Sequence, residues 1–288
     1  MNEQNMAVEQ EIGPNFIDLR SILESKNVHL SGVVVSMLNR LLHVRELNDE
    51  IYRHRDKFGV DFAKAILDDL GIAVQMEHAD RIPTAGSPII VGNHPLGGPD
   101  GMALIAAVGE KRDDVKFPVN DFLMHLPGLR PVFVPVDKVR HRASASAALV
   151  EAFAADNALL YFPAGLCSRR VKGKVRDLEW KSTFVKKAVA HHRDVVPVFF
   201  DAANRRRFYT IANWRKRLGI KFNFEMALLP GEMFAQRGHT FRLVVGSPVP
   251  WQTFETNRSP EEWAEKMRQH VYRLGTDADA QFLKGISV

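Results

Sequence analysis

Residues 91–104, "VGNHPLGGPDGMAL", join the end of an apolar run to a bend and then to the start of a helix. Pro95 disfavours helical geometry at His94, so the chain leaves the apolar run as a loop. Pro99 suits the first turn of the helix that follows. The stretch therefore predicts a strand, a loop and a helix in immediate succession, which is an arrangement typical of α/β folds.

Short apolar runs alternate with helical segments from about residue 81 onward. This alternation predicts an α/β fold in which a mixed, largely parallel sheet carries helices on both faces. Two later stretches, "KFNFEMALL" (221–229) and "TFRLVVG" (240–246), are interpreted as added antiparallel strands. Ser259 and Glu262 predict a capping box at the start of a helix over 259–275. The apolar runs are "PIIVG" (88–92), "VKFPV" (115–119), "PVFVPV" (131–136), "ALLYF" (158–162) and "VVPVFF" (195–200).

The first 80 residues have helical patterns. "DFAKAILDDLG" (61–71) has apolar residues at helical spacing and a glycine at its end. "GVVVSMLNRLLHV" (32–44) is apolar on most sides, so it either packs as a core helix or contacts a membrane. We therefore expect a helical N-terminal region over 1–80 and an α/β domain with a C-terminal helix over 81–288.

The composition is that of an ordinary globular protein, with 288 residues, 45% hydrophobic content and 25% charged residues. A net charge of +5 is compatible with nucleic acid, an anionic membrane or an acidic ligand. Cys167 is the single cysteine, which excludes an internal disulfide and favours a reducing compartment. The polar N-terminus does not resemble a signal peptide, and no apolar run reaches the roughly 18 residues of a transmembrane helix. We expect a cytoplasmic protein.

The bend itself carries candidate chemistry. Asn93 and His94 follow a strand directly, and ligands of open α/β sheets bind outside the carboxyl ends of strands. Gly97 and Gly98 allow the loop to bend and a ligand to approach closely. If the bend brings Asp100 to His94, the carboxylate can accept a hydrogen bond from one imidazole nitrogen. The other nitrogen is then a general base. The alternative is a structural corner without chemistry.

The stretch "NHPLGGPDG" resembles the first motif of the glycerolipid acyltransferase superfamily, the relatives of lysophosphatidic acid acyltransferases. That motif has four residues between His and Asp, and the gap of five here resembles a bacterial branch known as hemolysin-like proteins or aminolipid O-acyltransferases. Three later stretches resemble the second, third and fourth motifs in order: "RPVFVPVDKVR" (130–140), "LYFPAGLCSRR" (160–170) and "VPVFFDAANRRRFY" (196–209). The resemblance covers about residues 81–250.

The resemblance implies that His94 is the general base and that Asp100 orients it. The base activates an acceptor hydroxyl, which attacks an acyl thioester directly, without an acyl-enzyme. Asn93 or amides of the loop are candidates for stabilising the oxyanion, and Gly97 and Gly98 for contacting the substrate. No cofactor is implied, because acyl-CoA or an acyl carrier protein brings the acyl group as a substrate.

The third motif is implied to shape the acceptor site through Phe162, Pro163, Gly165 and Ser168. Its usual glutamate is replaced by Ala164, which favours an aminolipid or another lysolipid over glycerol phosphate. Three arginines are candidates for gripping a phosphate or carboxylate by bidentate bonds, and the alternative is a solvated basic surface. They are Arg140, Arg169 and Arg170.

Other reactive residue types do not form competing motifs. Cys167 is a possible nucleophile, but direct transfer needs none, and a small structural residue is the preferred interpretation. The G-x-S-x-G elbow of serine hydrolases and the phosphate-binding glycine motifs are absent from the sequence. His191 and His192 have no cysteine or carboxylate cluster beside them, so we expect no metal site.

"RRRFYTIANWRKR" (205–217) interleaves basic and aromatic residues. Nucleic acid is one possible partner and an anionic lipid surface is the other, with Phe208, Tyr209 and Trp214 at the interface. Beside a lipid-acylating motif, the membrane is the preferred partner, and an ordinary exposed helix is the remaining alternative.

The combined interpretation is an O-acyltransferase of membrane lipid biosynthesis that acylates a lysophospholipid or lyso-aminolipid at the inner face of the cell membrane. The alternatives are a His–Asp lipid or thioester hydrolase and a non-catalytic protein that binds membranes or nucleic acid.

Overall fold

The computed structural model describes residues 16–25, 27–120, 123–136, 143–221, 223–256 and 258–283, without the side chains of 143–146. Within these residues, seven strands form one sheet in the order β1-β9-β8-β2-β5-β3-β4. The strands are β1 (Ala73–Glu77), β2 (Ile89–Gly92), β3 (Val115–Asn120), β4 (Phe133–Val136), β5 (Ala158–Tyr161), β8 (Val195–Asp201) and β9 (Thr240–Val245).

The sheet is mixed and mostly parallel, as the alternation of strands and helices predicts. From β8 to β4 every neighbouring pair is parallel. β9 runs antiparallel to β8, and β1 is parallel to β9. The five parallel strands match the five apolar runs of the sequence, and β9 matches the expected antiparallel addition.

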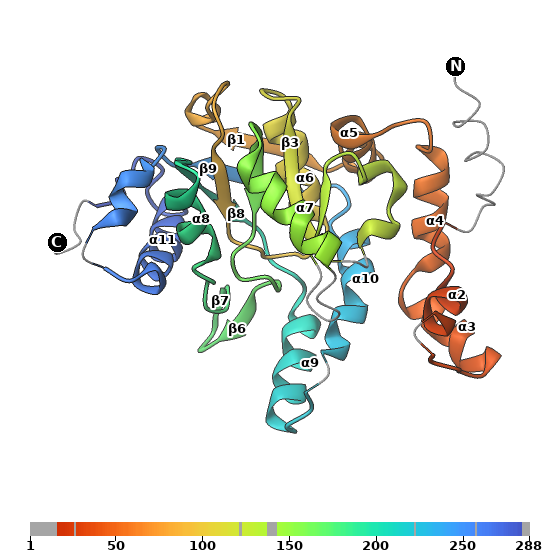
Figure 1. The fold of residues 1–288 in the computed structure, drawn as a ribbon. Coiled ribbons are helices and arrows are strands. Elements are labelled where there is room, and N and C mark those ends of the chain that lie inside the picture. The colour runs from red at the N-terminus through yellow and green to blue at the C-terminus, as the bar shows by residue number, and fades with distance from the viewer. Residues whose placement is uncertain are drawn as a thin grey trace, which may run out of the picture.

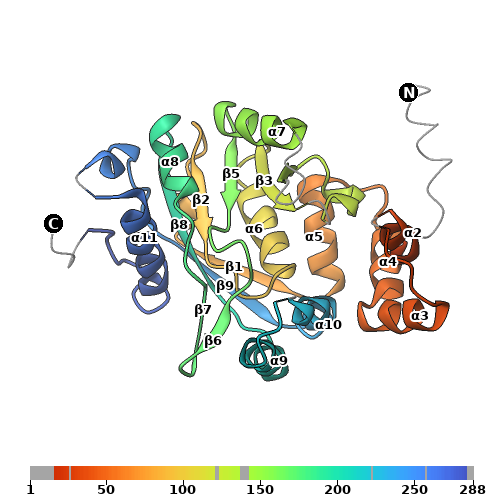
Figure 2. The same cartoon turned by 60° about the horizontal axis from the view of Figure 1, so that its bottom comes forward.

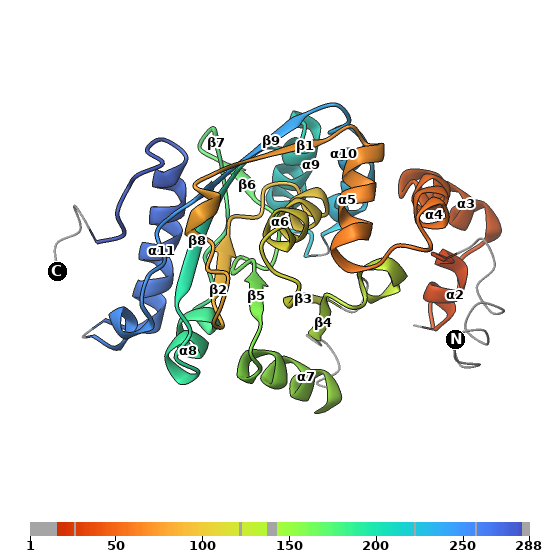
Figure 3. The same cartoon turned by 90° about the horizontal axis from the view of Figure 1, so that it is seen from above.

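Helices cover both faces of the sheet, which confirms the expected fold class (Figure 3). Along β2, Ile90 joins the core beneath one face, whereas Ile89 and Val91 join the core beneath the other, because successive side chains of a strand point to opposite faces. The first face is packed by α5 (Gly59–Asp69) and α6 (Pro99–Gly109). The second is packed by α7 (Ala143–Ala154), α8 (Thr183–Ala190) and α11 (Pro260–Leu274).

Two segments differ from the sequence interpretation. β1 precedes residue 81, so the sheet begins within the stretch that was expected to be helical. The described residues of 221–229 do not form the expected strand: the 3₁₀ helix η4 (Phe224–Leu228) leads directly into α10 (Leu229–Phe234). The alternating aromatic residues of this stretch have the period of a strand. In the structure, Glu225 of η4 is instead buried and forms an ion pair with Arg169.

The N-terminal helices α2 (Leu19–Glu24), α3 (Gly32–Leu41) and α4 (Val44–Arg53) stand beside the sheet (Figure 1). Val35 of α3 is buried, but Val33 and Met37 are exposed, so this apolar helix is only partly a core helix. The remaining 3₁₀ turns are η1 (Ala79–Arg81), η2 (Leu123–His125), η3 (Pro127–Leu129) and η5 (Trp251–Glu255). None of the helices in the described part of the chain has the length and apolarity needed to cross a bilayer.

Candidate active site

The candidate site lies at the carboxyl end of β2. The strand ends at Gly92, and the loop 93–98 leads into α6, whose first residue is Pro99. β5 and β8 flank β2 on its two sides and run parallel to it, so the segments that follow these strands reach the same edge. This edge is where open α/β sheets bind their ligands.

The loop brings His94 and Asp100 together. His94 Nδ1 lies 3.0 Å from Asp100 Oδ2, and the Asp100 side chain is fully buried. Asp100 also accepts hydrogen bonds from the main-chain N–H groups of Leu96, Gly97 and Gly101. These amides fix the buried carboxylate in place, and it holds Nδ1 as the protonated nitrogen. Nε2 is then the nitrogen able to accept a proton.

The charges of the pair stabilise each other. Burial lowers the pKa of His94, but the negative charge of Asp100 and its hydrogen bond outweigh burial, and the pKa lies above the usual imidazole value. Burial raises the pKa of Asp100, but His94 and the amides of Leu96 and Gly97 outweigh it, and the pKa lies below the usual carboxyl range. The carboxylate is therefore ionised while the imidazole can take up a proton.

Phe162, at the end of β5, fixes the plane of the imidazole. Its ring stacks on His94 with centroids 4.3 Å apart and an angle of 20°. Phe117 of β3 supports Phe162 from the side at 5.3 Å. A side chain at Gly92 would come within 3.3 Å of Phe162, so the small residue there leaves room for the stack. The predicted acceptor-site residue Phe162 is thus in contact with the candidate base.

The main chain of His94 is held from both sides. Its N–H donates to both carboxylate oxygens of Asp177, at 3.1 and 3.3 Å. Its carbonyl oxygen accepts a 2.7 Å bond from the N–H of Ser168. The Ser168 hydroxyl and the Trp180 indole also donate to Asp177, at 2.6 and 2.8 Å. Ser168, predicted to bind the acceptor, is instead buried and positions His94.

Asp177 is a site residue that sequence reasoning missed. Burial raises the pKa of Asp177, although Ser168, Trp180 and the amide of His94 oppose that effect. The residue lies directly after the β6–β7 hairpin, formed by β6 (Arg169–Val171) and β7 (Lys174–Arg176). No motif marks it in a single sequence, because 83 positions separate it from the histidine that it contacts.

The structure does not place Asn93 among donors that face a substrate. Its side-chain amide donates to the carbonyl of Phe200 at 2.9 Å and accepts from the N–H of Phe200 at 2.7 Å. Both amide atoms are therefore used in joining the end of β2 to β8, and the side chain is buried. The main-chain N–H groups of His94, Leu96 and Gly97 are engaged by Asp177 and Asp100, so the amide of Gly98 is the loop amide that remains a candidate oxyanion donor.

The two loop glycines have different roles. Gly97 has a φ of +105°, and a Cβ there would meet Leu229 at 2.8 Å. Its N–H is committed to Asp100. Gly98 is exposed, with open space where its side chain would be. Gly97 therefore permits the bend beneath α10, and Gly98 leaves the approach to the loop unobstructed.

Arg169 is not free to grip a ligand. It is buried, and its Nη2 lies 3.0 Å from Oε1 of the fully buried Glu225. Its Nη1 donates to the carbonyl of Cys167 at 2.6 Å. A guanidinium at this depth requires a partner, and Glu225 provides it, so ligand binding by Arg169 stays a prediction. Arg170 is exposed, and Arg140 lies outside the described residues.

The rest of the third motif forms a turn behind the histidine. Pro163 is buried and its carbonyl accepts a bond from Lys181. Gly165 has a φ of +63°, and its N–H donates to the carbonyl of Phe162. Cys167 is buried, and burial raises the pKa of its thiol to about 11. It is therefore a thiol at neutral pH, which is consistent with a structural role.

The expected interface of α9 (Arg206–Arg217) is corrected in part. Phe208 and Tyr209 are buried and pack with Cys167, so they cannot lie at a membrane interface. Trp214 is exposed. Asn204, just before this helix, donates to the carbonyls of Pro95 and Leu96 and so attaches the segment to the loop 93–98.

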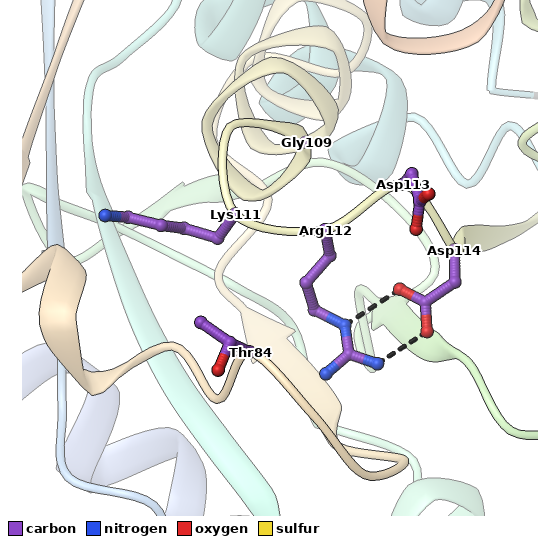
Figure 4. A pocket seen from close by; sticks show the side chains of 6 residues that line it. All are labelled: Thr84, Gly109, Lys111, Arg112, Asp113 and Asp114. Carbon is purple, nitrogen blue, oxygen red and sulfur yellow. Dashed lines mark hydrogen bonds and ion pairs between the residues drawn. The ribbon is translucent and has the colours of Figure 1, made fainter.

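Two other clusters lie away from His94. A pocket of about 440 Å³ lies at the C-terminal end of α6. Its lining is largely charged and does not suit an acyl chain, and Figure 4 shows Arg112 directed at Asp114. The lining residues are Thr84, Gly109, Lys111, Arg112, Asp113 and Asp114.

Within the described residues, Glu50, His54 and Asp69 form a group that could hold a metal ion between α4 and α5. Arg53 already pairs with both carboxylates of this group.

Fold and site together define an α/β protein with a His–Asp pair, suited to acid–base chemistry, at the carboxyl edge of a mostly parallel sheet. The acyltransferase family model matches residues 19–281, and the chain belongs to this family. It is therefore an enzyme of the acyltransferase class, as the four motifs imply.

Two curated relatives resemble nearly the whole chain, and both are named lyso-glycine lipid O-acyltransferase. The protein from Phocaeicola vulgatus is 43% identical over 264 residues, 90% of this chain and 95% of the relative. The protein from Bacteroides thetaiotaomicron is 44% identical over 264 residues, 90% and 97% of the two chains. The solved 1-acyl-sn-glycerophosphate (LPA) acyltransferase PlsC from Thermotoga maritima aligns with a TM-score of 0.47 at 17% identity, over 83% of this chain and 95% of PlsC.

Proposed function

We propose that this enzyme transfers a fatty acyl group from a thioester to the hydroxyl of a lysolipid, and that the acceptor is a lyso-glycine lipid. The acceptor class is supported by the names of both curated relatives, which match nearly the whole chain. The replacement of the usual glutamate by Ala164 also favours an acceptor other than a glycerol phosphate. The donor is acyl-CoA or an acyl carrier protein.

The observation that supports the mechanism most strongly is the 3.0 Å contact between His94 Nδ1 and Asp100. Nε2 takes the proton of the acceptor hydroxyl while the oxygen attacks the thioester carbonyl. The tetrahedral adduct then expels the thiolate, which takes the proton back from Nε2. The products are an ester and a free thiol, and the histidine returns to its starting state. General-base catalysis of this kind contributes roughly 10²- to 10⁴-fold in rate.

A long-chain acceptor is supplied by a membrane, so the enzyme works as a peripheral protein, and we place it at the inner face of the cell membrane. The association with a membrane follows from the acceptor and its two-chain product, since both partition into a bilayer.

The test incubates purified protein with a labelled acyl thioester, either acyl-CoA or acyl carrier protein, and a panel of lysolipids. We expect labelled ester with lyso-glycine lipid and little with lysophosphatidic acid. His94→Ala should abolish the product, while His192→Ala, a histidine stacked on Trp251, should retain it. Label that appears as free fatty acid regardless of the acceptor would instead identify a hydrolase. Ester formation by His94→Ala at the wild-type rate would reject the mechanism.

A further inference from the structure

The β6–β7 hairpin and α9, with the residues that follow it, form one basic surface. We call it the basic face and define it as residues 170–176 and 206–221. The side chain of Asn213 donates to the carbonyl of Arg170 at 3.3 Å and joins the two segments. Neither segment contains an aspartate or glutamate. Its exposed cationic side chains are Arg170, Lys172, Lys174, Arg176, Arg206, Arg207, Lys216, Arg217 and Lys221, of which Arg207 pairs with the buried Glu232.

Large apolar side chains are exposed among these cations. Trp214 is 68% exposed and Leu218 is 66% exposed, and their spacing of four residues places them on one side of α9. Val171 on the hairpin is 56% exposed. A surface that carries exposed tryptophan and leucine together with lysine and arginine is suited to the interface of an anionic bilayer.

The basic face is attached to the loop 93–98 through both of its segments. Ser168, two residues before the hairpin part, donates to the main chain of His94. Asn204, two residues before α9, donates to the main chain of Pro95 and Leu96. Whatever binds the basic face is therefore brought to the edge of the sheet that carries the candidate base.

A second pair of exposed apolar side chains lies on α3. Val33 of α3 is 82% exposed and Met37 is 64% exposed. In Figure 1, α3, α9 and the hairpin all reach the lower side, and Figure 2 shows them together when that side is turned toward the viewer. A broad, flat partner can meet separate projections of this kind at once, which favours a bilayer over a nucleic-acid strand or a small acidic protein.

We infer that the basic face docks on an anionic lipid bilayer, with headgroup phosphates on the cations and with Trp214 and Leu218 in the interfacial layer. This inference rests on the proposed function and names the surface through which the enzyme reaches its acceptor. One lysine or arginine beside an anionic membrane strengthens binding by about fivefold. Reversing two such charges is therefore expected to weaken binding by at least tenfold.

The test measures co-sedimentation of the full chain with phosphatidylcholine vesicles that either contain or lack phosphatidylglycerol. The variants are Lys172→Glu/Lys174→Glu and Trp214→Ser/Leu218→Ser, and the charge-matched control is Lys57→Glu/Lys111→Glu, with both lysines outside the basic face. We expect binding that requires phosphatidylglycerol, a loss of at least tenfold in the first variant and a clear loss in the second. The control should bind like the wild type.

Acyl transfer to a detergent-dispersed lysolipid should be unchanged in both variants, since neither touches His94 or Asp100. His94→Ala should bind vesicles like the wild type, so vesicle binding is scored independently of the proposed chemistry. The inference is overturned if the wild type binds both vesicle types equally, or if reversing Lys172 and Lys174 leaves binding unchanged. Tighter binding to an oligonucleotide than to anionic vesicles, lost in the same variants, would assign the face to nucleic acid.

Discussion

Asp100 is the residue on which the imidazole depends most directly. It accepts three main-chain N–H bonds as well as the bond from His94, so its oxygens are all engaged as acceptors. Asp100→Asn keeps the size of the side chain, but it places an NH₂ donor where a carboxylate oxygen now accepts hydrogen bonds from N–H groups. We expect kcat to fall by about 10²- to 10⁴-fold while the fold is kept. Steady-state kinetics checks the rate and thermal unfolding checks the fold; a variant with near-normal kcat would contradict the orienting role.

The pH dependence of the reaction follows from His94. The base must be neutral to take a proton, and the pKa of His94 is raised above the usual value of about 6.5. Because a raised pKa keeps the imidazole protonated to higher pH, kcat/KM should increase with pH and level off only above the usual histidine range. A pH profile of kcat/KM in an ionic-strength-matched buffer series measures the midpoint. A midpoint below 6 would be inconsistent with this environment.

Asp177 is a positioning residue whose effect can be separated from simple structural support. The charged groups that influence His94 are Asp100 and Asp177, which raise the pKa of His94, and Arg169, which lowers it. Asp177→Asn should lower kcat with little change in KM and should also shift the pH midpoint downward. Asp194→Asn is the matched control, since Asp194 accepts a main-chain bond from Trp251. Loss of activity without a shift of the midpoint would reduce Asp177 to a structural role.

At this scale, sequence reasoning succeeded where the residues are close in the chain. The proline, the glycines and the helix start between His94 and Asp100 determine a bend, and the bend is short enough to interpret locally. The partners of Asn93, Arg169 and Ser168 come from β8, η4 and the segment after β7. Nothing in their local sequence identifies these partners, so a buried ion pair was interpreted as a free cation.

At the scale of elements, periodicity predicted the strands that are buried on both faces, because such strands are short continuous apolar runs. β1 was missed because its five residues alternate between exposed and half-buried positions at the edge of the sheet. The stretch that contains η4 was predicted to be a strand because its aromatic residues alternate. A single sequence does not show that the glutamate between them is buried in a 3₁₀ helix. The capping box of α11, in contrast, is a local signal and is present as predicted.

The capping box gives a prediction about the stability of α11. The Ser259 hydroxyl accepts from the N–H of Glu262, and the Glu262 carboxylate accepts from the N–H of Ser259. α11 also braces the site, since the Tyr272 hydroxyl accepts the N–H of Asp177. Ser259→Ala should lower the free energy of unfolding by about 1 kcal/mol. Urea denaturation measures the change. Ser87→Ala is the control, because it removes one exposed serine hydrogen bond, to Asp156, at a position that does not start a helix.

For the whole molecule, the alternation of strands and helices determined the class of fold but not how distant segments would be joined. The described structure ties three of them through one carboxylate. Glu225 of η4 pairs with Arg169, the first residue of β6, at 3.0 Å and with Arg215 of α9 at 2.7 Å. Replacing the carboxylate of Glu225 leaves two mostly buried arginines without a negatively charged partner. The free energy of unfolding should therefore fall, and the attachment among all three segments should weaken.

We therefore expect Glu225→Gln to lower the free energy of unfolding by about 3–5 kcal/mol, the range found when a buried pair loses one partner. The exposed Glu255→Gln is the matched control and should change stability by less than about 0.5 kcal/mol. Because Arg169 follows Ser168, which holds the main chain of His94, the loss should also weaken the site before global unfolding. Hydrogen exchange of the Ser168 amide, compared between the two variants, measures this local effect. Equal protection and equal stability in Glu225→Gln and Glu255→Gln would mean that the three segments are held together by apolar packing alone.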